Sequence, residues 1–577
     1  MKQFHRFDLT TFVRTFFCII ILSFLLLPQI AFASPLLDEY NYVPLYFDGY
    51  DTGYQACTIK GNAYIPIDAL KEYGDCTGFA IDEQKKQILV TPAEMDLFIG
   101  DEETTAFIQQ YAGTCYYSLK NIDRTAYVSL NLIKDFCDLS YTVDEDDVSS
   151  NKNATAITCV NMERASDSVR TAAVVRRTAA AGSLFDADGG KITLKKGQEV
   201  YVLGSTSNFY QVRTFDGDVC YVSKSDLGEV VSGNPGYDYI YTAKKKDLSG
   251  DKFNMVWFSA NASGVSALPP DEDGVDVVAP VWLHQIVNGD GNVESCGDRG
   301  FVDLCHERNK QVWICLTNDM TTKGSTNYTS AVLADEQLRR KTVAQYLFYA
   351  CLFDADGLNI DYEDVLTADG SNLTLFTAEL YEYCSRLGLV LSSDVLIPTP
   401  GNLKIYQYDK VIDSLDYLCA MTYDQHWSSS PQAGSVSDQT WYTQCIEDLL
   451  QYCPGEKLLM GVPFYTRIGN VDAKGNKLGS TAVIMDSARI KVSRSGITPV
   501  WLPDKGQYYI EYTENGKLYR IWLEDKRSIA TRLSNVYYYG LAGTCCWRYG
   551  QQEEGILQVF DDIYHCGGSP GAYTEPY

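Results

Sequence analysis

The chain has 577 residues, with 48 Lys and Arg against 75 Asp and Glu, and a formal net charge of −27. At roughly 150 residues per domain, its length indicates about three or four domains. A hydrophobic content of 45% and a charged content of 21% exclude a wholly disordered chain. The negative charge argues against nucleic-acid binding through clustered Lys and Arg, and against docking on anionic lipid.

The first 33 residues have the pattern of an export signal. Lys2, Arg6 and Arg14 precede an apolar run, Phe16 to Leu27, and Ala31-Phe-Ala33 supplies the small residues that flank a cleavage site. An uncleaved anchor is the alternative, but the run is short for a membrane span of ~20 residues. The sequence therefore predicts a secreted protein with no stable membrane span after cleavage.

The cysteines suggest neither a metal site nor a readable disulfide framework. Cleavage would remove Cys18 and leave 17 of the 18 cysteines, an odd number whose connectivity the sequence does not reveal. There is no Cys-x-x-Cys pair and no Cys/His spacing typical of zinc, so we expect no metal and no cofactor. Cys315, Cys419 and Cys545 lie in apolar runs and are expected to be buried thiols.

Residues 42–160 contain a weak internal repeat. Asn62 to Gly74 is followed by Phe79 to Asp82, and Thr125 to Cys137 by Tyr141 to Asp144, so each unit reads as strand, short helix, strand. The unit resembles the small α+β domain at the N-terminus of copper amine oxidases, and this resemblance implies a binding or spacer role. It implies no copper, because the five histidines form no ligand set.

A polar segment, Ser149 to Asp167, is predicted to be a linker. Residues 168–231 then show short strands with turn signals, including Leu194 to Leu203 and Tyr210 to Val222, at the spacing of a small β-barrel. They resemble a bacterial SH3-type domain, which implies anchoring to a cell-wall polymer. A spacer without a ligand is the alternative.

Residues 237–566 alternate between apolar strands and helices. Eight apolar runs read as buried strands: Phe253–Phe258, Val275–Trp282, Gln311–Leu316, Gly357–Glu363, Gly388–Val395, Tyr417–Asp424, Lys457–Phe464 and Gly540–Trp547. Helical stretches lie between most of them, which predicts a (β/α)₈ TIM barrel. The long gap before the eighth strand, about 468–524, predicts a small α+β insertion. We thus expect a multidomain chain in which this C-terminal barrel follows an α+β duplicated N-terminal domain and a small SH3-like β-barrel.

The fourth predicted strand carries acidic residues. Because strand side chains alternate, Asn359, Asp361 and Glu363 share one face, and the opposite face is apolar. The polar face would point into the barrel, with Glu363 at the C-terminal mouth where this fold places its active sites. Two carboxylates in a partly dry site have separated pKa values, so one can hold the proton that an acid catalyst needs. A half-solvated strand is the alternative, and the apolar opposite face argues against it.

Asp356-x-x-Asn359-x-Asp361-x-Glu363 is similar to the DxxDxDxE signature of glycoside hydrolase family 18. Asn359 departs from that signature at its second acidic position, as in the spore and cell-wall glucosaminidase branch. Three further segments resemble family motifs on later strands: Met421-Thr-Tyr-Asp424, Gly461 to Arg467, and Gly543 to Gly550. Together the resemblance covers about residues 237–565.

The resemblance also implies a mechanism, since family 18 is a substrate-assisted exception to two-carboxylate glycoside hydrolysis. The sugar's own 2-acetamido carbonyl attacks the anomeric carbon. Glu363 would act as acid and then base, Asp361 would bind the acetamido N–H, and Tyr423 would bind its oxygen. The remaining implied substrate-binding residues are Asn359, Met421, Asp424 and, as the apolar floor beneath the sugar ring, Trp547. The neutral Asn359 cannot act as an extra acid but could still hydrogen-bond Asp361.

The function predicted is that of an exported glycosidase that cleaves β-1,4 bonds after N-acetylglucosamine in peptidoglycan. A chitinase or chito-oligosaccharide hydrolase is the alternative within the same reaction class, and its partners would be chitin-type glycans. A non-catalytic glycan-binding barrel is weaker, because such proteins usually lose the acid and Glu363 is present. A cysteine wall peptidase lacks a recognisable Cys/His pair.

Overall fold

The structure is a computed structural model. It describes residues 40–59, 62–74, 79–82, 87–90, 102–111, 115–130, 132–133, 139–147, 155–164, 169–184, 190–232, 248, 252–259, 268–286, 288–320 and 328–574. The predicted export signal, residues 1–33, lies outside this part of the chain. Among the helices described, none has the length and apolarity to cross a bilayer. Cys315, Cys419 and Cys545 are buried thiols, as expected.

The N-terminal region is built on a seven-stranded sheet ordered β7-β8-β3-β2-β1-β10-β9. Its strands are β1 (Tyr40–Phe47), β2 (Tyr50–Ile59), β3 (Asn62–Pro66), β7 (Lys120–Ile122), β8 (Thr125–Ser129), β9 (Leu139–Asp147) and β10 (Thr155–Arg164). Helices α2 (Ile67–Tyr73) and α3 (Glu102–Tyr111) and a small sheet of β4 (Phe79–Asp82), β5 (Gln87–Val90) and β6 (Cys115–Ser118) complete it. The opening strands of the two repeat units, β3 and β8, are antiparallel neighbours.

The predicted linker Ser149 to Asp167 is wrong over ten residues, because Thr155–Arg164 form strand β10. This strand pairs in parallel with β1 and antiparallel with β9, so it lies inside the sheet. Its buried residues include Ile157, Val160 and Met162. The linker was predicted because the segment begins with polar residues, and the apolar pattern that follows them is short.

The second region forms its own antiparallel sheet, ordered β13-β12-β16-β15-β14-β11-β17. Its strands are β11 (Arg170–Ala173), β12 (Thr178–Ala181), β13 (Lys191–Leu194), β14 (Glu199–Ser205), β15 (Phe209–Arg213), β16 (Val219–Ser223) and β17 (Val231–Ser232). A separate apolar core includes Val200, Val202, Val212 and Val222. The SH3-type and copper-amine-oxidase-type assignments of the two N-terminal regions remain predictions.

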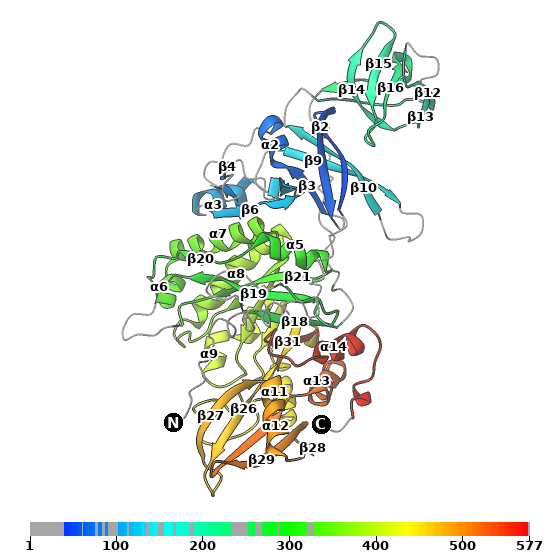
Figure 1. Ribbon diagram of the computed structural model, residues 1–577. Coiled ribbons are helices and arrows are strands. Elements are labelled where there is room, and N and C mark those ends of the chain that lie inside the picture. The colour runs from blue at the N-terminus through cyan, green and yellow to red at the C-terminus, as the bar shows by residue number, and fades with distance from the viewer. Residues whose placement is uncertain are drawn as a thin grey trace, which may run out of the picture.

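Both flanks of the N-terminal sheet carry buried polar contacts. On one side Arg213 of β15 donates to Gly49 O at 2.8 Å and to Asn161 Oδ1 at 2.6 Å, and its guanidinium lies 3.7 Å from the Tyr46 ring centre. On the other side Arg299 donates to Ser129 Oγ at 3.0 Å. The sheet thus lies between the second region and the barrel (Figure 1).

The C-terminal region is the predicted barrel. All eight expected strands are present as β18 (Phe253–Phe258), β19 (Val277–Gln285), β21 (Gln311–Thr317), β22 (Gly357–Asp361), β23 (Val390–Val395), β24 (Tyr417–Ala420), β25 (Leu458–Pro463) and β31 (Gly543–Trp547). They pair in parallel, and the β18–β19 and β18–β31 ladders close the ring. A short strand, β20 (Val293–Ser295), pairs antiparallel with β19 at its end.

Helices surround this ring of strands (Figure 1). They are α5 (Arg299–Glu307), α6 (Tyr328–Ala334), α7 (Glu336–Phe353), α8 (Gly370–Leu387), α9 (Asn402–Tyr406), α10 (Tyr408–Val411), α11 (Gln439–Leu449), α13 (Lys526–Tyr538) and α14 (Ile556–Tyr564). Asp335 caps α7 by accepting the N–H groups of Gln337 and Leu338, which explains why that helix begins where it does.

The long gap before the last strand holds a small lobe. Its five-stranded sheet, ordered β27-β26-β30-β29-β28, packs with helix α12 (Met485–Ser495). The strands are β26 (Tyr465–Val471), β27 (Lys477–Ile484), β28 (Val500–Leu502), β29 (Gln507–Glu514) and β30 (Lys517–Leu523).

A buried ion pair ties the lobe to the barrel. Glu524, directly after β30, accepts from Arg532 of α13 at 2.6 and 2.8 Å. The same guanidinium donates to Ser437 O, just before α11. Both charged side chains are almost fully buried.

Candidate active site

Strand β22 sends polar side chains into the barrel and apolar ones outward, as its alternation predicts. Gly357 opens the strand, and a Cβ there would lie 2.6 Å from Val390 O, so only glycine allows this approach to β23. Outside, the Tyr362 ring stacks on Phe376 of α8 at 5.2 Å and its hydroxyl lies 3.0 Å from that of Tyr346 on α7. Asn359 and Asp361 therefore face the interior.

Asp356, the first residue of the motif, lies at the opposite end of the strand from the mouth. Its Oδ2 is 2.8 Å from His306 Nε2 and accepts the N–H of Val312 at 2.8 Å. It holds α5 and β21 in place and does not line the cavity at the mouth.

Glu363 follows the end of β22 and is held by its backbone. Its N–H donates to Asn318 Oδ1 at 3.0 Å and its carbonyl accepts from Asn318 Nδ2 at 2.8 Å. Asn318 comes directly after β21, so two neighbouring strands fix the position of Glu363. Burial raises the pKa of the half-buried Glu363 carboxyl, and the negative charges of Asp364 and Asp424 raise it further.

Asp361 has the more perturbed environment. Burial, with the nearby charge of Glu363 second, raises its pKa to about 7. Its Oδ1 atom is buried and has no hydrogen-bond partner within the described part of the chain. An orphaned acceptor at this place is available to a donor on a bound molecule.

A cavity of about 240 Å³ opens at the mouth of the barrel. The residues proposed from the sequence that line it are Asp361, Glu363, Met421, Tyr423, Asp424 and Trp547. Sequence reasoning missed the other four lining residues, Trp257, Asp394, Leu396 and Tyr465. The inward alternation of Ser392 and Asp394 on the fifth barrel strand was a signal that could have found Asp394.

Aromatic rings form much of the cavity wall. The Trp257 ring centre lies 6.4 Å from that of Tyr423 and 5.9 Å from that of Trp547. Tyr465 donates its hydroxyl to Asp424 Oδ1 at 2.8 Å. Burial raises the pKa of Tyr423 well above its ordinary value, so its hydroxyl stays neutral and can donate a hydrogen bond.

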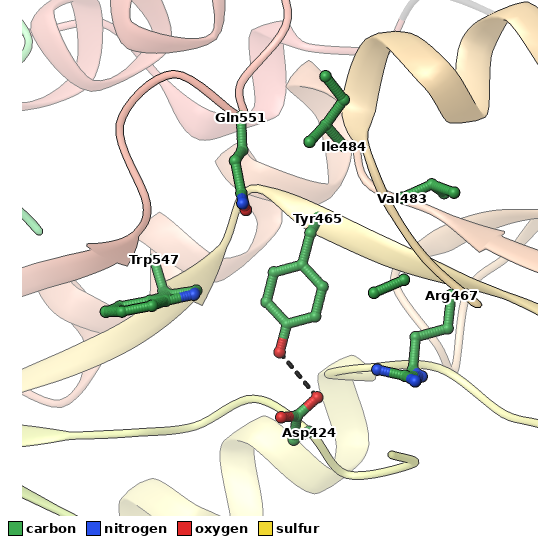
Figure 2. Close-up of a pocket in the computed structure, with 8 residues that line it drawn as sticks. Asp424, Tyr465, Arg467, Val483, Ile484, Trp547 and Gln551 are labelled. Atoms are coloured by element: carbon green, nitrogen blue, oxygen red, sulfur yellow. Dashed lines mark hydrogen bonds between the residues drawn. The ribbon is translucent and has the colours of Figure 1, made fainter. Parts of the chain in front are cut away.

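A second cavity of about 270 Å³ adjoins the first on the side of the inserted lobe. Asp424, Tyr465 and Trp547 line both cavities, and Arg467 and Ile484 of the lobe line the second (Figure 2). The lobe therefore extends the space around the barrel mouth into a longer cleft.

Asn359 does not line the cavity, and its hydrogen-bond partners lie on β23 and not at Asp361. It is fully buried, and its amide nitrogen donates to Ser392 Oγ at 3.0 Å and to Asp394 Oδ1 at 2.8 Å. Its amide oxygen accepts from Trp257 Nε1 at 3.1 Å. The residue is therefore a support beneath the cavity and not a surface for substrate.

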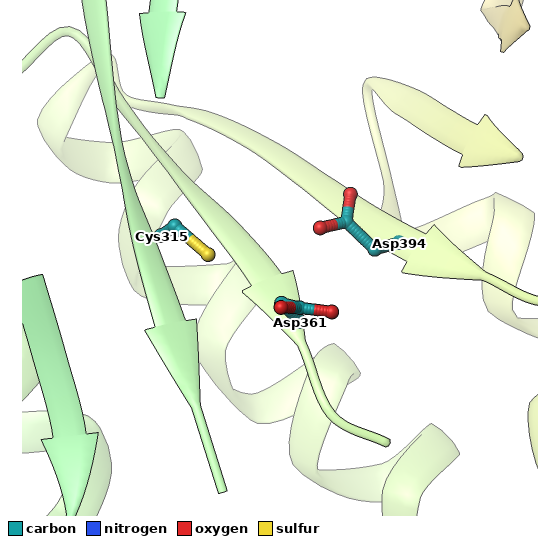
Figure 3. Close-up of side chains that lie close together, drawn as sticks. All are labelled: Cys315, Asp361 and Asp394. Carbon is teal, nitrogen blue, oxygen red and sulfur yellow. The ribbon is translucent and has the colours of Figure 1, made fainter. Parts of the chain in front are cut away.

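Cys315, Asp361 and Asp394 offer one donor atom each within 4.8 Å of one another, on three neighbouring strands (Figure 3). Their chemistry fits a metal poorly. Both Asp394 oxygens already accept N–H groups, and burial raises the pKa of the Cys315 thiol, whereas a metal needs free, deprotonated ligands.

Comparison with known proteins finds similarity over the barrel. Residues 301–552 match the family described as glycosyl hydrolases family 18. The chain is 26% identical over 275 residues to di-N-acetylchitobiase of Rattus norvegicus, covering 42% of this chain and 72% of that relative. It is 24% identical over 250 residues to the cortical fragment-lytic enzyme of Bacillus anthracis, covering 41% of this chain and 56% of that relative.

Among solved structures, a chitinase from Chromobacterium violaceum aligns with a TM-score of 0.47 and 22% identity, over 54% of this chain and 98% of that one. The family match covers β21 to β31, the strands that supply the carboxylates and most of the cavity wall. The match to glycosyl hydrolase family 18, a family of glycosidases, thus falls on the barrel that holds the candidate active site.

Proposed function

We propose that this protein is an exported glycosidase that hydrolyses β-1,4 bonds after N-acetylglucosamine in peptidoglycan, with retention of configuration. One observation carries the proposal: Glu363, Asp361 and Tyr423 line a single cavity with an aromatic wall at the barrel mouth. An acid, a second carboxylate and a neutral hydroxyl are the groups that an N-acetylated sugar needs to react through its own acetamido arm.

In the first step the acetamido carbonyl oxygen attacks the anomeric carbon as the bond to the leaving oxygen breaks. Glu363 gives its proton to that oxygen, and an oxazolinium ion remains on the sugar. In the second step water attacks the anomeric carbon from the vacated side, the bond to the acetamido oxygen breaks, and Glu363 takes a proton from that water. Two inversions at one carbon give net retention.

Asp361 and Tyr423 orient the attacking arm. The orphaned Oδ1 of Asp361 accepts the acetamido N–H and its charge balances the developing oxazolinium. The Tyr423 hydroxyl donates to the acetamido oxygen and fixes its angle of attack. Trp547 supplies the apolar floor, and Met421 and Asp424 complete the subsite.

The choice of peptidoglycan over chitin rests on three features. These are the predicted SH3-type region, the neutral Asn359 in the acidic motif, and similarity to a cortical fragment-lytic enzyme. Similarity to a di-N-acetylchitobiase favours the second candidate, a chito-oligosaccharide hydrolase.

Mass spectrometry of the products from purified peptidoglycan and from chitin tests the proposal. New reducing-end N-acetylglucosamine from the wall, absent with a Glu363→Gln variant, is the expected result. Release from chitin alone would overturn the substrate, and release from neither would overturn the function. A thiazoline analogue of N-acetylglucosamine is expected to inhibit competitively, and indifference to it would contradict the acetamido mechanism.

A further inference from the structure

Strand β23 brings a third carboxylate to the reaction centre. It runs parallel to β22 with Asn359 opposite Ser392 and Ile360 opposite Ser393, so the next inward-facing residues, Asp361 and Asp394, lie side by side. One oxygen of each carboxylate lies within 4.8 Å of the other (Figure 3). Only 7% of Asp361 and 2% of Asp394 are exposed to solvent.

Within the described residues, neither carboxylate forms an ion pair with a Lys, Arg or His. Asp394 accepts neutral donors instead, Asn359 Nδ2 on one oxygen at 2.8 Å and Trp257 Nε1 on the other at 3.1 Å. Two adjacent carboxylates in a dry interior without a cation cannot both be charged, so the pair retains one proton at neutral pH.

We propose that Asp394 is a positioning residue that shares one proton with Asp361 and thereby sets when Asp361 is charged. This inference rests on the proposed function for its catalytic meaning, but the shared proton itself does not depend on any substrate. Position 359, the neighbour of Asp361 on β22, offers only a neutral amide, so the second carboxylate comes from the adjacent strand.

Other titratable groups face Asp394 from every side of the barrel interior. They are Asp361 on β22, Cys315 on β21, Cys419 on β24, Cys545 on β31, and Tyr406 and Tyr423 beyond the strand ends. Burial raises the pKa of each of these thiols and phenols, so they stay neutral. Glu363 faces Asp361 in turn.

The shared proton gives Asp361 two states. In one state the proton lies on Asp361, and two N–H donors stabilise the charge on Asp394. When an acetamido N–H reaches Asp361, the proton leaves its oxygen and bonds to an Asp394 oxygen. The negative charge passes to Asp361, where it balances the oxazolinium, and the pair keeps the same total charge.

An isosteric exchange tests this assignment. Asp394→Asn removes the carboxylate next to Asp361. The double variant Asn359→Asp with Asp394→Asn moves that carboxylate from β23 to β22 and leaves the amino-acid composition unchanged. Ser392→Ala is the matched control, because it removes a second oxygen acceptor of the Asn359 amide without changing charge. All four proteins are compared as the full chain, with circular dichroism to confirm folding.

The first readout is the infrared carbonyl band of a neutral carboxylic acid at neutral pH, assigned by isotope-labelled aspartate. We expect the band in the native protein and the control, its loss in Asp394→Asn, and its return in the double variant. A band that persists in Asp394→Asn would overturn the shared proton. If Asp394→Asn fails to fold, the double variant serves in its place. Loss of the band in the folded double variant would also overturn the shared proton.

The second readout is the pH dependence of kcat/KM. Because Asp361 must be charged, activity rises with pH through the titration of the pair, and Asp394→Asn should move that acidic limb down by roughly one unit or more. The double variant should return the acidic limb to its native position. An acidic limb that does not move in Asp394→Asn would refute the positioning role of Asp394. An absence of activity on every glycan would refute the proposed function. The infrared result would still show whether Asp361 and Asp394 share a proton.

Discussion

At the scale of single residues, the environment of Glu363 depends on where β22 stops. The strand ends at Asp361, and Asn318 from the neighbouring strand fixes the Glu363 backbone by two hydrogen bonds. The side chain is therefore half-buried beside Asp361 at the mouth. This placement raises the pKa of the carboxyl and fixes its backbone beside the cavity.

Replacing Glu363 by Gln should lower hydrolysis by about 10²–10⁴-fold or more, because the amide cannot donate the proton. Fold and sugar binding should be retained, since the side chain keeps its size. Initial rates by reducing-end release and binding of chito-oligosaccharide by calorimetry check this. Glu382→Gln on the exposed face of α8 is the control, and full activity in Glu363→Gln would contradict the assignment.

The raised pKa of Glu363 predicts the alkaline limb of the pH profile. A raised pKa keeps the acid protonated to higher pH, so kcat/KM should fall only above the usual carboxyl range. Asp364→Asn removes one negative neighbour, lowers the pKa of Glu363 and should move this limb to lower pH. Asn tolerates the positive φ of 51° at this position. A limb that stays in place or moves up would exclude Asp364 as a cause.

The sequence predicted six of the ten lining residues because they follow motifs within single strands. Asp394, Trp257 and Asn318 were not predicted, because each acts through contacts with residues 35 to more than 100 positions away, and no local pattern reports such pairs. Proximity in sequence suggested that Asn359 could hydrogen-bond Asp361. Its side-chain amide instead donates hydrogen bonds to Ser392 and Asp394 of β23.

At the scale of elements, the periodicity of two on β22 correctly separated the interior face from the helix-packed face. All eight barrel strands were located because each is a buried apolar run and helices lie between most of them. Strand β10 was missed because its few apolar residues lie in a polar segment and only pairing with β1 and β9 makes it a strand.

The Glu524–Arg532 pair should stabilise the junction between lobe and barrel. Glu524→Gln leaves the buried Arg532 without its charge partner and should cost about 3–5 kcal/mol in unfolding free energy. Urea unfolding measures this loss. Arg386→Ala, which breaks the exposed pair with Glu382 on α8, is the control and should cost about 0–1 kcal/mol. Equal costs for the two changes would contradict the role assigned to the junction.

At the scale of the whole molecule, the N-terminal sheet contacts both of its neighbours through specific side chains. Towards the barrel, Lys120 pairs with Glu307 at 3.1 Å and Phe107 stacks on Tyr383 at 4.9 Å. Towards the second region, Arg213 is almost fully buried between Tyr46 and Tyr201. The three regions therefore form one continuous body in Figure 1.

Arg213→Ala should loosen the second region from the N-terminal sheet, because it removes two hydrogen bonds and the cation between two aromatic rings. The radius of gyration measured by small-angle X-ray scattering should rise, with the barrel's own unfolding unchanged. Arg176→Ala, whose partner Asp226 lies within the same region, is the control. An unchanged radius would show that other contacts hold the interface.

The second region packs on the N-terminal sheet and that sheet packs on the barrel, and this arrangement has a consequence for polymer degradation. If the second region binds one glycan strand, the cleft lies at a constant distance from the bound strand. Cleavage would then occur at that distance, and the fragments would have a narrow length distribution. Lengthening the chain between β10 and β11 would then broaden the distribution without altering the chemistry of each cut.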